Sequence, residues 1–191
     1  MTRIIAGTAG GIRLDVPDRG TRPTSERVRE SLFGALDSAD AIAGTRVLDL
    51  YAGTGALGLE ALSRGGVSAD LVEKAGPAAT VAQRNAERVS RAVGAPARVH
   101  RSRVQAFLRQ ARATYDLVFT DPPYELSDGD LAADLALLGG VLSPDALVVV
   151  ERGKRAAEPD WAASGLELVR GRVYGDTAVW WAQPLAASQS A

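Results

Sequence analysis

Cysteine is absent from the 191-residue chain, and histidine occurs only once, at His100. The absence of cysteine excludes disulfide bonds, thiolate metal sites and a cysteine nucleophile. A single histidine leaves little basis for a histidine-based triad or a site of several imidazoles around a metal. No apolar run approaches the roughly 20 residues that a membrane-spanning helix needs, and the first residues lack the apolar segment of a signal peptide. We therefore expect a soluble cytoplasmic protein that uses no metal and does not bind a membrane.

The overall composition is globular, with 46% hydrophobic and 24% charged residues and a net charge of only −1. The charges are unevenly distributed along the chain. Residues 84–112 contain eight arginines and one acid, whereas residues 113–151 contain eight acids and no lysine or arginine. This asymmetry fits either solvated helix faces or a surface that faces a polyanion, and the charges alone do not decide between them.

The N-terminal segment is predicted to form a hairpin followed by a helix. Residues 3–6 and 12–16 are typical of two short strands, and the glycines between them suit a turn. A loop is expected next, and Thr24 or Ser25 begins a helix that ends near Leu36, because its apolar residues recur on one helical face.

From Arg46 onward the pattern alternates between strands and helices, which predicts βαβ units and a mostly parallel sheet. The last two strand candidates follow each other without a helix, so an antiparallel edge is expected. Strands are predicted at 47–51, 69–73, 97–100, 115–120, 146–151, 166–174 and 178–182, and helices at 56–63, 76–93, 105–113 and 128–138. We expect residues 1–23 to form an arm and loop, 24–183 the main α/β domain, and 184–191 a flexible tail.

A glycine-rich turn between strand 47–51 and helix 56–63 is the strongest local signal. Gly53, Gly55 and Gly58 match the Gly-x-Gly-x-x-Gly fingerprint of nucleoside-binding loops, and Glu73 follows the next strand, where its carboxylate suits a ribose diol. The pattern leaves open a dinucleotide or S-adenosylmethionine (SAM). Asp49 inside the strand favours SAM, because a carboxylate suits a cationic ligand better than a pyrophosphate.

A second signal is the sequence Asp-Pro-Pro-Tyr at Asp121–Tyr124, directly after strand 115–120. Proline lacks an N–H group, so the loop is stiff and offers acceptors, namely the Asp121 carboxylate and the Pro122 carbonyl. Tyr124 offers a flat face for a planar group. These features predict a site for an exocyclic amine, whose alignment with a methyl donor supplies most of the catalysis.

Together these motifs resemble class I SAM-dependent methyltransferases that act on an amine nitrogen. The segments 3–7, 21–24 (Thr-Arg-Pro-Thr) and 27–33 further resemble the RsmD family, bacterial 16S rRNA guanine-N2 methyltransferases. The resemblance implies a Rossmann-like, seven-stranded, mostly parallel sheet with an N-terminal β-hairpin extension. It also implies a monomer that uses SAM, releases S-adenosylhomocysteine (SAH), and methylates a flipped guanine of the small ribosomal subunit.

The candidate residues fall into three groups on this interpretation. The catalytic candidates are Asp121, Pro122 and Tyr124. The cofactor-binding candidates are Asp49, Tyr51, Ala52, Gly53, Thr54, Gly55, Glu73, Val104, Gln105 and Asp121. Val104 and Gln105 are included as adenine contacts because the acid often found in this region of the superfamily is absent here. The RNA-binding candidates are Arg3, Arg13, Arg22, Thr24, Arg27, Arg29, Pro123 and Tyr124.

Three other functions compete with this interpretation. A different amine-directed methyltransferase would act on DNA adenine or cytosine, or on a protein glutamine, although the chain leaves little room for a DNA target-recognition region. An NAD-dependent oxidoreductase would use the glycine fingerprint but would leave the Asp121–Tyr124 loop unexplained. A non-catalytic RNA-binding assembly factor would bind RNA without turnover.

Overall fold

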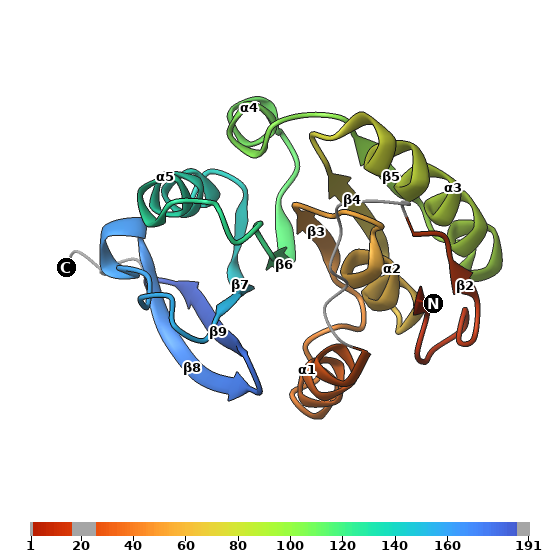
Figure 1. Ribbon diagram of the computed structural model, residues 1–191, viewed down its shortest axis with the longest axis horizontal. Coiled ribbons are helices and arrows are strands. Elements are labelled where there is room, and N and C mark those ends of the chain that lie inside the picture. The colour runs from red at the N-terminus through yellow and green to blue at the C-terminus, as the bar shows by residue number, and fades with distance from the viewer. Residues whose placement is uncertain (1, 17–25, 187–191) are drawn as a thin grey trace.

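The computed structural model describes residues 2–16 and 26–186, which fold into a twisted sheet covered by helices (Figure 1). The elements in chain order are β1 (Thr2–Arg3), β2 (Arg13–Leu14), α1 (Glu26–Ser38), β3 (Arg46–Leu50), α2 (Ala56–Ser63), β4 (Ser68–Val72), α3 (Gly76–Val93), β5 (Ala97–His100), α4 (Val104–Gln110), β6 (Tyr115–Thr120), α5 (Asp128–Leu138), β7 (Leu142–Gly153), the short 3-10 helix η1 (Ala162–Ser164), β8 (Leu166–Tyr174) and β9 (Thr177–Pro184). Among the described residues, no helix is both long and apolar enough to cross a membrane.

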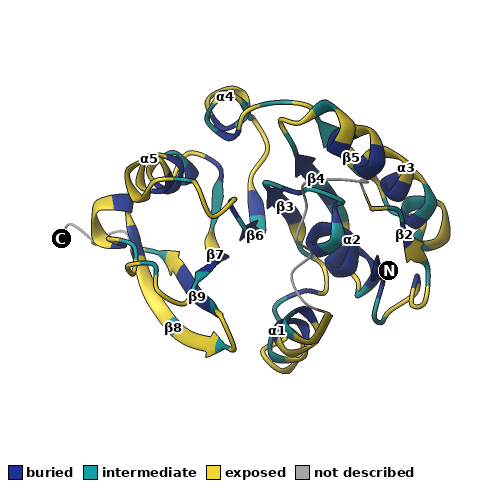
Figure 2. Cartoon of the chain, viewed as in Figure 1, coloured by how far each residue is buried: buried dark blue, intermediate teal, exposed yellow. Residues whose placement is uncertain are grey.

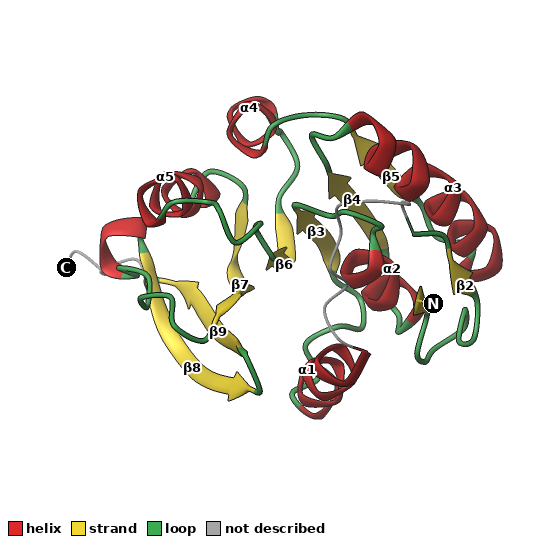
Figure 3. Ribbon diagram, in the orientation of Figure 1, coloured by secondary structure: helices red, strands yellow, loops and turns green. Residues whose placement is uncertain are grey.

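The main sheet has seven strands in the order β5-β4-β3-β6-β7-β9-β8, and β1 and β2 form a separate antiparallel pair. The five strands from β5 to β7 are parallel, whereas β9 runs antiparallel to both β7 and β8. Figure 3 shows the helices packed around this sheet. The predicted seven-stranded, mostly parallel sheet with an N-terminal hairpin is therefore confirmed.

The alternation of side chains along the central strands divides the core into two layers. Val47 and Leu117 point to the side of α1, α2 and α3, whereas Leu48 and Val118 point to the side of α4 and α5. The central strands are buried on both faces (Figure 2), which explains why their sequences are nearly continuous apolar runs.

The N-terminal hairpin packs against α2 through a buried carboxylate. Glu60 is 0% exposed and accepts hydrogen bonds from the backbone N–H groups of Ile5 (2.7 Å) and Ala6 (3.0 Å). It also pairs with Arg64 at 2.8 Å. One turn further along α2, Ser63 accepts from the N–H of Ala9 and donates to the carbonyl of Ala6. The hairpin is thus part of the folded domain.

This packing explains why the hairpin strands are shorter than predicted. The sequence predicts strands over 3–6 and 12–16, but only Thr2–Arg3 and Arg13–Leu14 pair as strands. The N–H of Ile4 still bonds across the hairpin to the carbonyl of Ile12, but the N–H groups of Ile5 and Ala6 bond to Glu60 and do not continue the ladder. Other differences are small: β7 begins at Leu142, four residues before the predicted strand, and an irregularity in its pairing with β6 interrupts the pattern there.

Arg29 is buried, whereas its predicted contact with RNA requires an exposed side chain. It is only 2% exposed, and it donates to the carbonyl oxygen of Arg3 at 2.5 Å. Burial lowers the pKa of Arg29, and the negative charges of Glu60 and Glu26 oppose this effect. The side chain therefore holds the hairpin against α1, and in this arrangement its guanidinium is not exposed for an RNA contact.

We expect Glu60→Ala to destabilise the fold by roughly 3–5 kcal/mol, because it leaves Arg64 without its buried partner and the hairpin N–H groups without an acceptor. The free energy of unfolding is measured by urea denaturation followed by circular dichroism. Glu87→Ala is the matched control, since Glu87 is an exposed acid on α3. Equal stability of the two variants would contradict the role given to Glu60.

Candidate functional site

The glycine-rich loop leaves the C-terminal end of β3 and enters α2, as the sequence predicts. Gly53 and Gly55 have left-handed φ angles of 55° and 80°, which glycine adopts at little cost. Tyr51 also lies in the left-handed region, with a φ of 62°. Such a conformation is uncommon for a tyrosine and occurs mainly where the surrounding structure enforces it.

Asp49 supports this loop from inside the sheet. It is 1% exposed, and its carboxylate accepts a hydrogen bond from the backbone N–H of Gly58 at 2.8 Å. A Cβ atom at Gly58 would lie 2.4 Å from a methyl group of Leu71 and 3.0 Å from the Cβ of Asp49. Gly58, the third glycine of the motif, therefore permits close packing of helix α2 on the sheet.

The same loop is held by Glu73, which follows β4. Its carboxylate accepts hydrogen bonds from the N–H groups of Gly53 at 3.0 Å and Ala75 at 2.7 Å. This contact arises because β3 and β4 are parallel with Leu50 opposite Val72, so the loops that follow the two strands lie side by side. Glu73 thus reaches the glycine loop, beside which the sequence predicts it to bind a ribose.

The electrostatic environment of Asp49 is unfavourable for its negative charge. Burial raises its pKa to about 7, the hydrogen bond from Gly58 lowers it, and the negative charges of Asp121 and Glu73 raise it further. Three carboxylates therefore gather where the strands end. A cationic ligand at this place would stabilise all three charges.

A polar cluster on the other side of the loop connects it to α4 and α5. The hydroxyl of Tyr51 donates to the carboxylate of Asp134, which is 2% exposed. Burial raises the pKa of Asp134, while hydrogen bonds from Tyr51 and Gln105 lower it. The side chain of Gln105 also accepts a hydrogen bond from Arg109 at 3.3 Å. Gln105 therefore lies near the loop, where it already has protein partners.

Asp134 is missing from the sequence-based list of site residues, although the sequence contains a signal for it. It lies on the buried face of α5 between Leu131, Leu135 and Leu138. An acid in the apolar stripe of a helix requires a buried polar partner. The identity of that partner, Tyr51, follows only from the packing of α5 over the end of β3.

The loop Asp121–Tyr124 follows β6, next to the glycine loop, because β3 and β6 are parallel with Leu50 opposite Thr120. The carbonyl of Pro123 accepts from the N–H of Leu126 at 2.9 Å, which closes the turn. Tyr124 is 63% exposed. A Cβ atom added at Gly153 would lie 3.2 Å from the Tyr124 ring, so the absence of a side chain at Gly153 leaves room for that ring.

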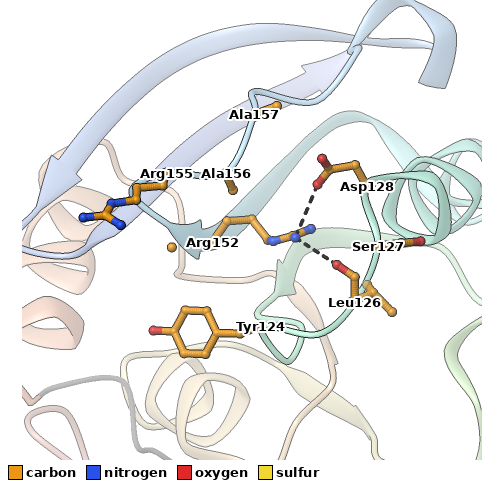
Figure 4. Close-up of a pocket in the computed structure, with 9 residues that line it drawn as sticks. Tyr124, Leu126, Ser127, Asp128, Arg152, Arg155, Ala156 and Ala157 are labelled. Carbon is orange, nitrogen blue, oxygen red and sulfur yellow. Dashed lines mark hydrogen bonds and ion pairs between the residues drawn. The ribbon is translucent and has the colours of Figure 1, made fainter.

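A pocket of about 560 Å³ opens beside Tyr124 (Figure 4). Arg152 lines it and is held by the carbonyl of Leu126 at 2.9 Å and the carboxylate of Asp128 at 3.3 Å. The residues around the pocket are Tyr124, Leu126, Ser127, Asp128, Arg152, Gly153, Arg155, Ala156 and Ala157. Apart from Tyr124, none of these was a candidate from the sequence, because they come from two segments that only the β6–β7 pairing brings together.

The remaining candidates that the structure describes lie on the hairpin, α1 and α4. Arg3, Arg13 and Arg27 are exposed, and Arg3 pairs with Glu26 at 3.0 Å. Arg22 and Thr24 lie outside the described residues. Val104 is buried at the first position of α4. The structure thus brings the glycine loop, Glu73 and the Asp121–Tyr124 loop to one edge of the sheet. Arg3 and Arg13 belong to the hairpin, and Arg27 belongs to α1.

We expect Asp49→Asn to stabilise the protein at pH 8 by roughly 2–4 kcal/mol. The folded protein keeps the Asp49 proton up to about pH 7, whereas the unfolded chain loses it near pH 4. The wild-type free energy of unfolding therefore falls as the pH rises from about 4 to about 7, and asparagine removes this loss while its amide oxygen still accepts from Gly58. Urea unfolding at several pH values measures the effect.

Asp116→Asn is the matched control, and the change that it is expected to make in the free energy of unfolding has the opposite sign. Burial opposes ionisation of Asp116, but hydrogen bonds from the Arg46 N–H and the Ser143 hydroxyl leave its pKa lowered. This carboxylate contributes stability above its unfolded pKa, and the contribution is lost as the pH falls through the folded value. Asp116→Asn should therefore destabilise the protein at pH 8. Destabilisation by Asp49→Asn at pH 8 would contradict the account of Asp49.

Comparison with known proteins places the chain among methyltransferases. A family model described as "Conserved hypothetical protein 95" matches residues 2–183. The Escherichia coli protein named ribosomal RNA small subunit methyltransferase D is 40% identical over 150 residues, which cover 78% of this chain and 73% of that protein. The Bacillus subtilis protein named putative rRNA methyltransferase YlbH is 33% identical over 183 residues, covering 93% and 96% of the two chains.

Solved structures give the same result for the fold. The structure named putative methyltransferase yhhF from Escherichia coli superimposes with a TM-score of 0.84 at 38% identity, covering 97% of this chain and 99% of that one. Magnesium protoporphyrin IX methyltransferase from Synechocystis, solved with bound SAM, shares the fold alone, with a TM-score of 0.68 at 13% identity over 87% and 86% of the chains. The fold is that of class I methyltransferases, and by its sequence match over residues 2–183 the chain belongs to the RsmD family.

Proposed function

We propose that this protein transfers a methyl group from SAM to the exocyclic N2 amine of a guanine in 16S rRNA of the small ribosomal subunit. The observation that carries the proposal is the adjacency of two loops on parallel strands. One is the glycine loop after β3, beside which lie the carboxylates of Asp49 and Glu73, and the other is the Asp121–Tyr124 loop after β6. The names of its relatives support rRNA as the substrate class.

The residues around the glycine loop fit SAM by charge and by shape. SAM carries a sulfonium and an ammonium, and when bound it supplies an electrophilic methyl group whose leaving group is a neutral thioether. Asp49 and Glu73 are carboxylates beside the loop, and Asp121 is close enough for its charge to raise the pKa of Asp49. Gly53 and Gly55 leave two positions of the turn without side chains. Glu73 would accept from the ribose hydroxyls, and Tyr51, Ala52 and Thr54 would line the same site.

The amine acceptor site fits the Asp121–Tyr124 loop. The lone pair of an exocyclic amine is delocalised into the base, so the nitrogen needs acceptors for its hydrogens to direct that lone pair at the methyl group. The Asp121 carboxylate and the Pro122 carbonyl are such acceptors, and stacking on the exposed Tyr124 ring contributes roughly 1–3 kcal/mol. No covalent intermediate is required, which agrees with the absence of cysteine from the chain.

The RNA-binding surface is proposed from charge and exposure. Arg3, Arg13 and Arg27 are exposed on the hairpin and α1, and such side chains neutralise phosphates. Pro123 and Tyr124 would contact the flipped guanine itself. We further propose that the protein acts in the cytoplasm as a monomer.

We expect Asp121→Ala to lower kcat for methyl transfer by at least about 100-fold, because the amine loses its directing acceptor, while the dissociation constant of SAM changes only a few-fold. The assay is transfer of labelled methyl from SAM to small ribosomal subunits that lack this modification, with the product nucleoside identified by mass spectrometry. Asp128→Ala, which removes a carboxylate that is 66% exposed on the pocket rim, is the control and should keep most activity.

Label recovered as N2-methylguanosine from subunits, and lost in Asp121→Ala, would support the proposal. Near-normal turnover by Asp121→Ala would refute the acceptor role. Tight SAM binding without label on rRNA, but with label on DNA or protein, would instead identify a different amine substrate.

A further inference from the structure

Asn85 connects two parts of the molecule that the proposed function uses separately. It lies in α3 and is 0% exposed. Its side-chain oxygen accepts from the backbone N–H of Asp15 at 2.8 Å, and its amide nitrogen donates to the carbonyls of Asp15 and Thr54, both at 3.0 Å. Both of its N–H donors are therefore used inside the protein.

The partners of Asn85 belong to the hairpin and the glycine loop. Asp15 directly follows β2, so this residue fixes the end of the hairpin. Thr54 lies between Gly53 and Gly55. The carboxylate of Asp15 pairs with Arg84 at 3.7 Å and Arg88 at 3.2 Å, and these ion pairs reach the hairpin only.

Asparagine is chemically suited to this position. Its planar amide presents a donor and an acceptor side by side, so it pairs with the N–H and C=O of Asp15 as a neighbouring strand would. The second N–H then remains for Thr54. Aspartate lacks the donors, and leucine lacks both donors and acceptor. In this buried site each unmatched backbone group would carry a desolvation penalty.

We propose that Asn85 is a positioning residue that couples the glycine loop to the hairpin, so that cofactor binding at the loop and ordering of the hairpin favour each other. This inference rests on the proposed function, which assigns the cofactor to the loop and nucleic acid to the hairpin. Coupling of this kind is reciprocal, so anything that orders the hairpin tightens cofactor binding by the same factor. Within residues 2–16 and 26–186, the Asn85 side chain makes hydrogen bonds to both the hairpin and the glycine loop.

The test uses SAH as the probe and measures its effect on the hairpin and its affinity for the glycine loop. Hydrogen exchange of the peptide covering residues 2–16 is followed with and without saturating SAH, and SAH affinity is measured by calorimetry. In the wild type, SAH should slow exchange of the hairpin several-fold. In Asn85→Leu, SAH affinity should fall by about 3- to 10-fold, and SAH at saturation should no longer slow hairpin exchange.

Ser63→Ala is the matched control. It also removes buried hydrogen bonds to the hairpin, since the Ser63 hydroxyl bonds to Ala6 and Ala9, whereas Asn85 bonds to Thr54 as well as to the hairpin. Hairpin exchange should be faster overall in this variant, yet SAH should still slow it, and SAH affinity should stay within about two-fold of the wild type. If Asn85 has only a structural role, the Asn85→Leu and Ser63→Ala variants will behave alike. That result would overturn the proposal.

Circular dichroism establishes that each variant is folded. If Asn85→Leu does not fold, the isosteric Asn85→Asp replaces it. The same loss of SAH affinity and of hairpin protection is expected, because the carboxylate accepts from Asp15 but does not donate to Thr54. Protection of the hairpin by SAH in either Asn85 variant, or no protection in the wild type, would refute the coupling while leaving the proposed function intact. Failure of the wild type to bind SAH would overturn the proposed function together with this inference.

Discussion

β3 lies between β4 and β6, and its backbone pairs in parallel with both, with Leu50 opposite Val72 on one side and Thr120 on the other. Parallel strands of the same register end at the same edge of a sheet, so the loops that follow them must meet. This pairing alone brings the glycine loop next to Glu73 and the Asp121–Tyr124 loop. The two helical layers contribute by burying both faces of β3, which keeps the register fixed.

The same arrangement places charge repulsion and backbone strain in the protein when no ligand is bound. Asp49 is buried beneath the glycine loop, and the charges of Asp121 and Glu73 add to the burial in raising its pKa to about 7. The left-handed conformation of Tyr51 is a second local strain, held in place by the buried carboxylate of Asp134. Strain and charge repulsion of this kind are characteristic of functional sites, where a ligand relieves them.

The hairpin is fixed to the domain by hydrogen bonds and is not a free arm. Its backbone is bound by Glu60 and Ser63 on α2, by Arg29 on α1 and by Asn85 on α3. α2 begins where the glycine loop ends, so the helix that carries the hairpin is also the one that closes this loop. The mechanical support of the proposed RNA surface and that of the proposed cofactor loop are therefore largely shared.

The sequence by itself determined most of the strands and helices of the main sheet and the positions of the two loops, because apolar periodicity, paired glycines and the Asp-Pro-Pro-Tyr turn are local properties of the chain. It did not reveal that Arg29 is buried, that Asp134 binds Tyr51, or that Asn85 links Asp15 to Thr54. These facts depend on which helix packs against which residue far away in the sequence. A buried polar side chain is determined by its partner, and only the tertiary structure decided that partner.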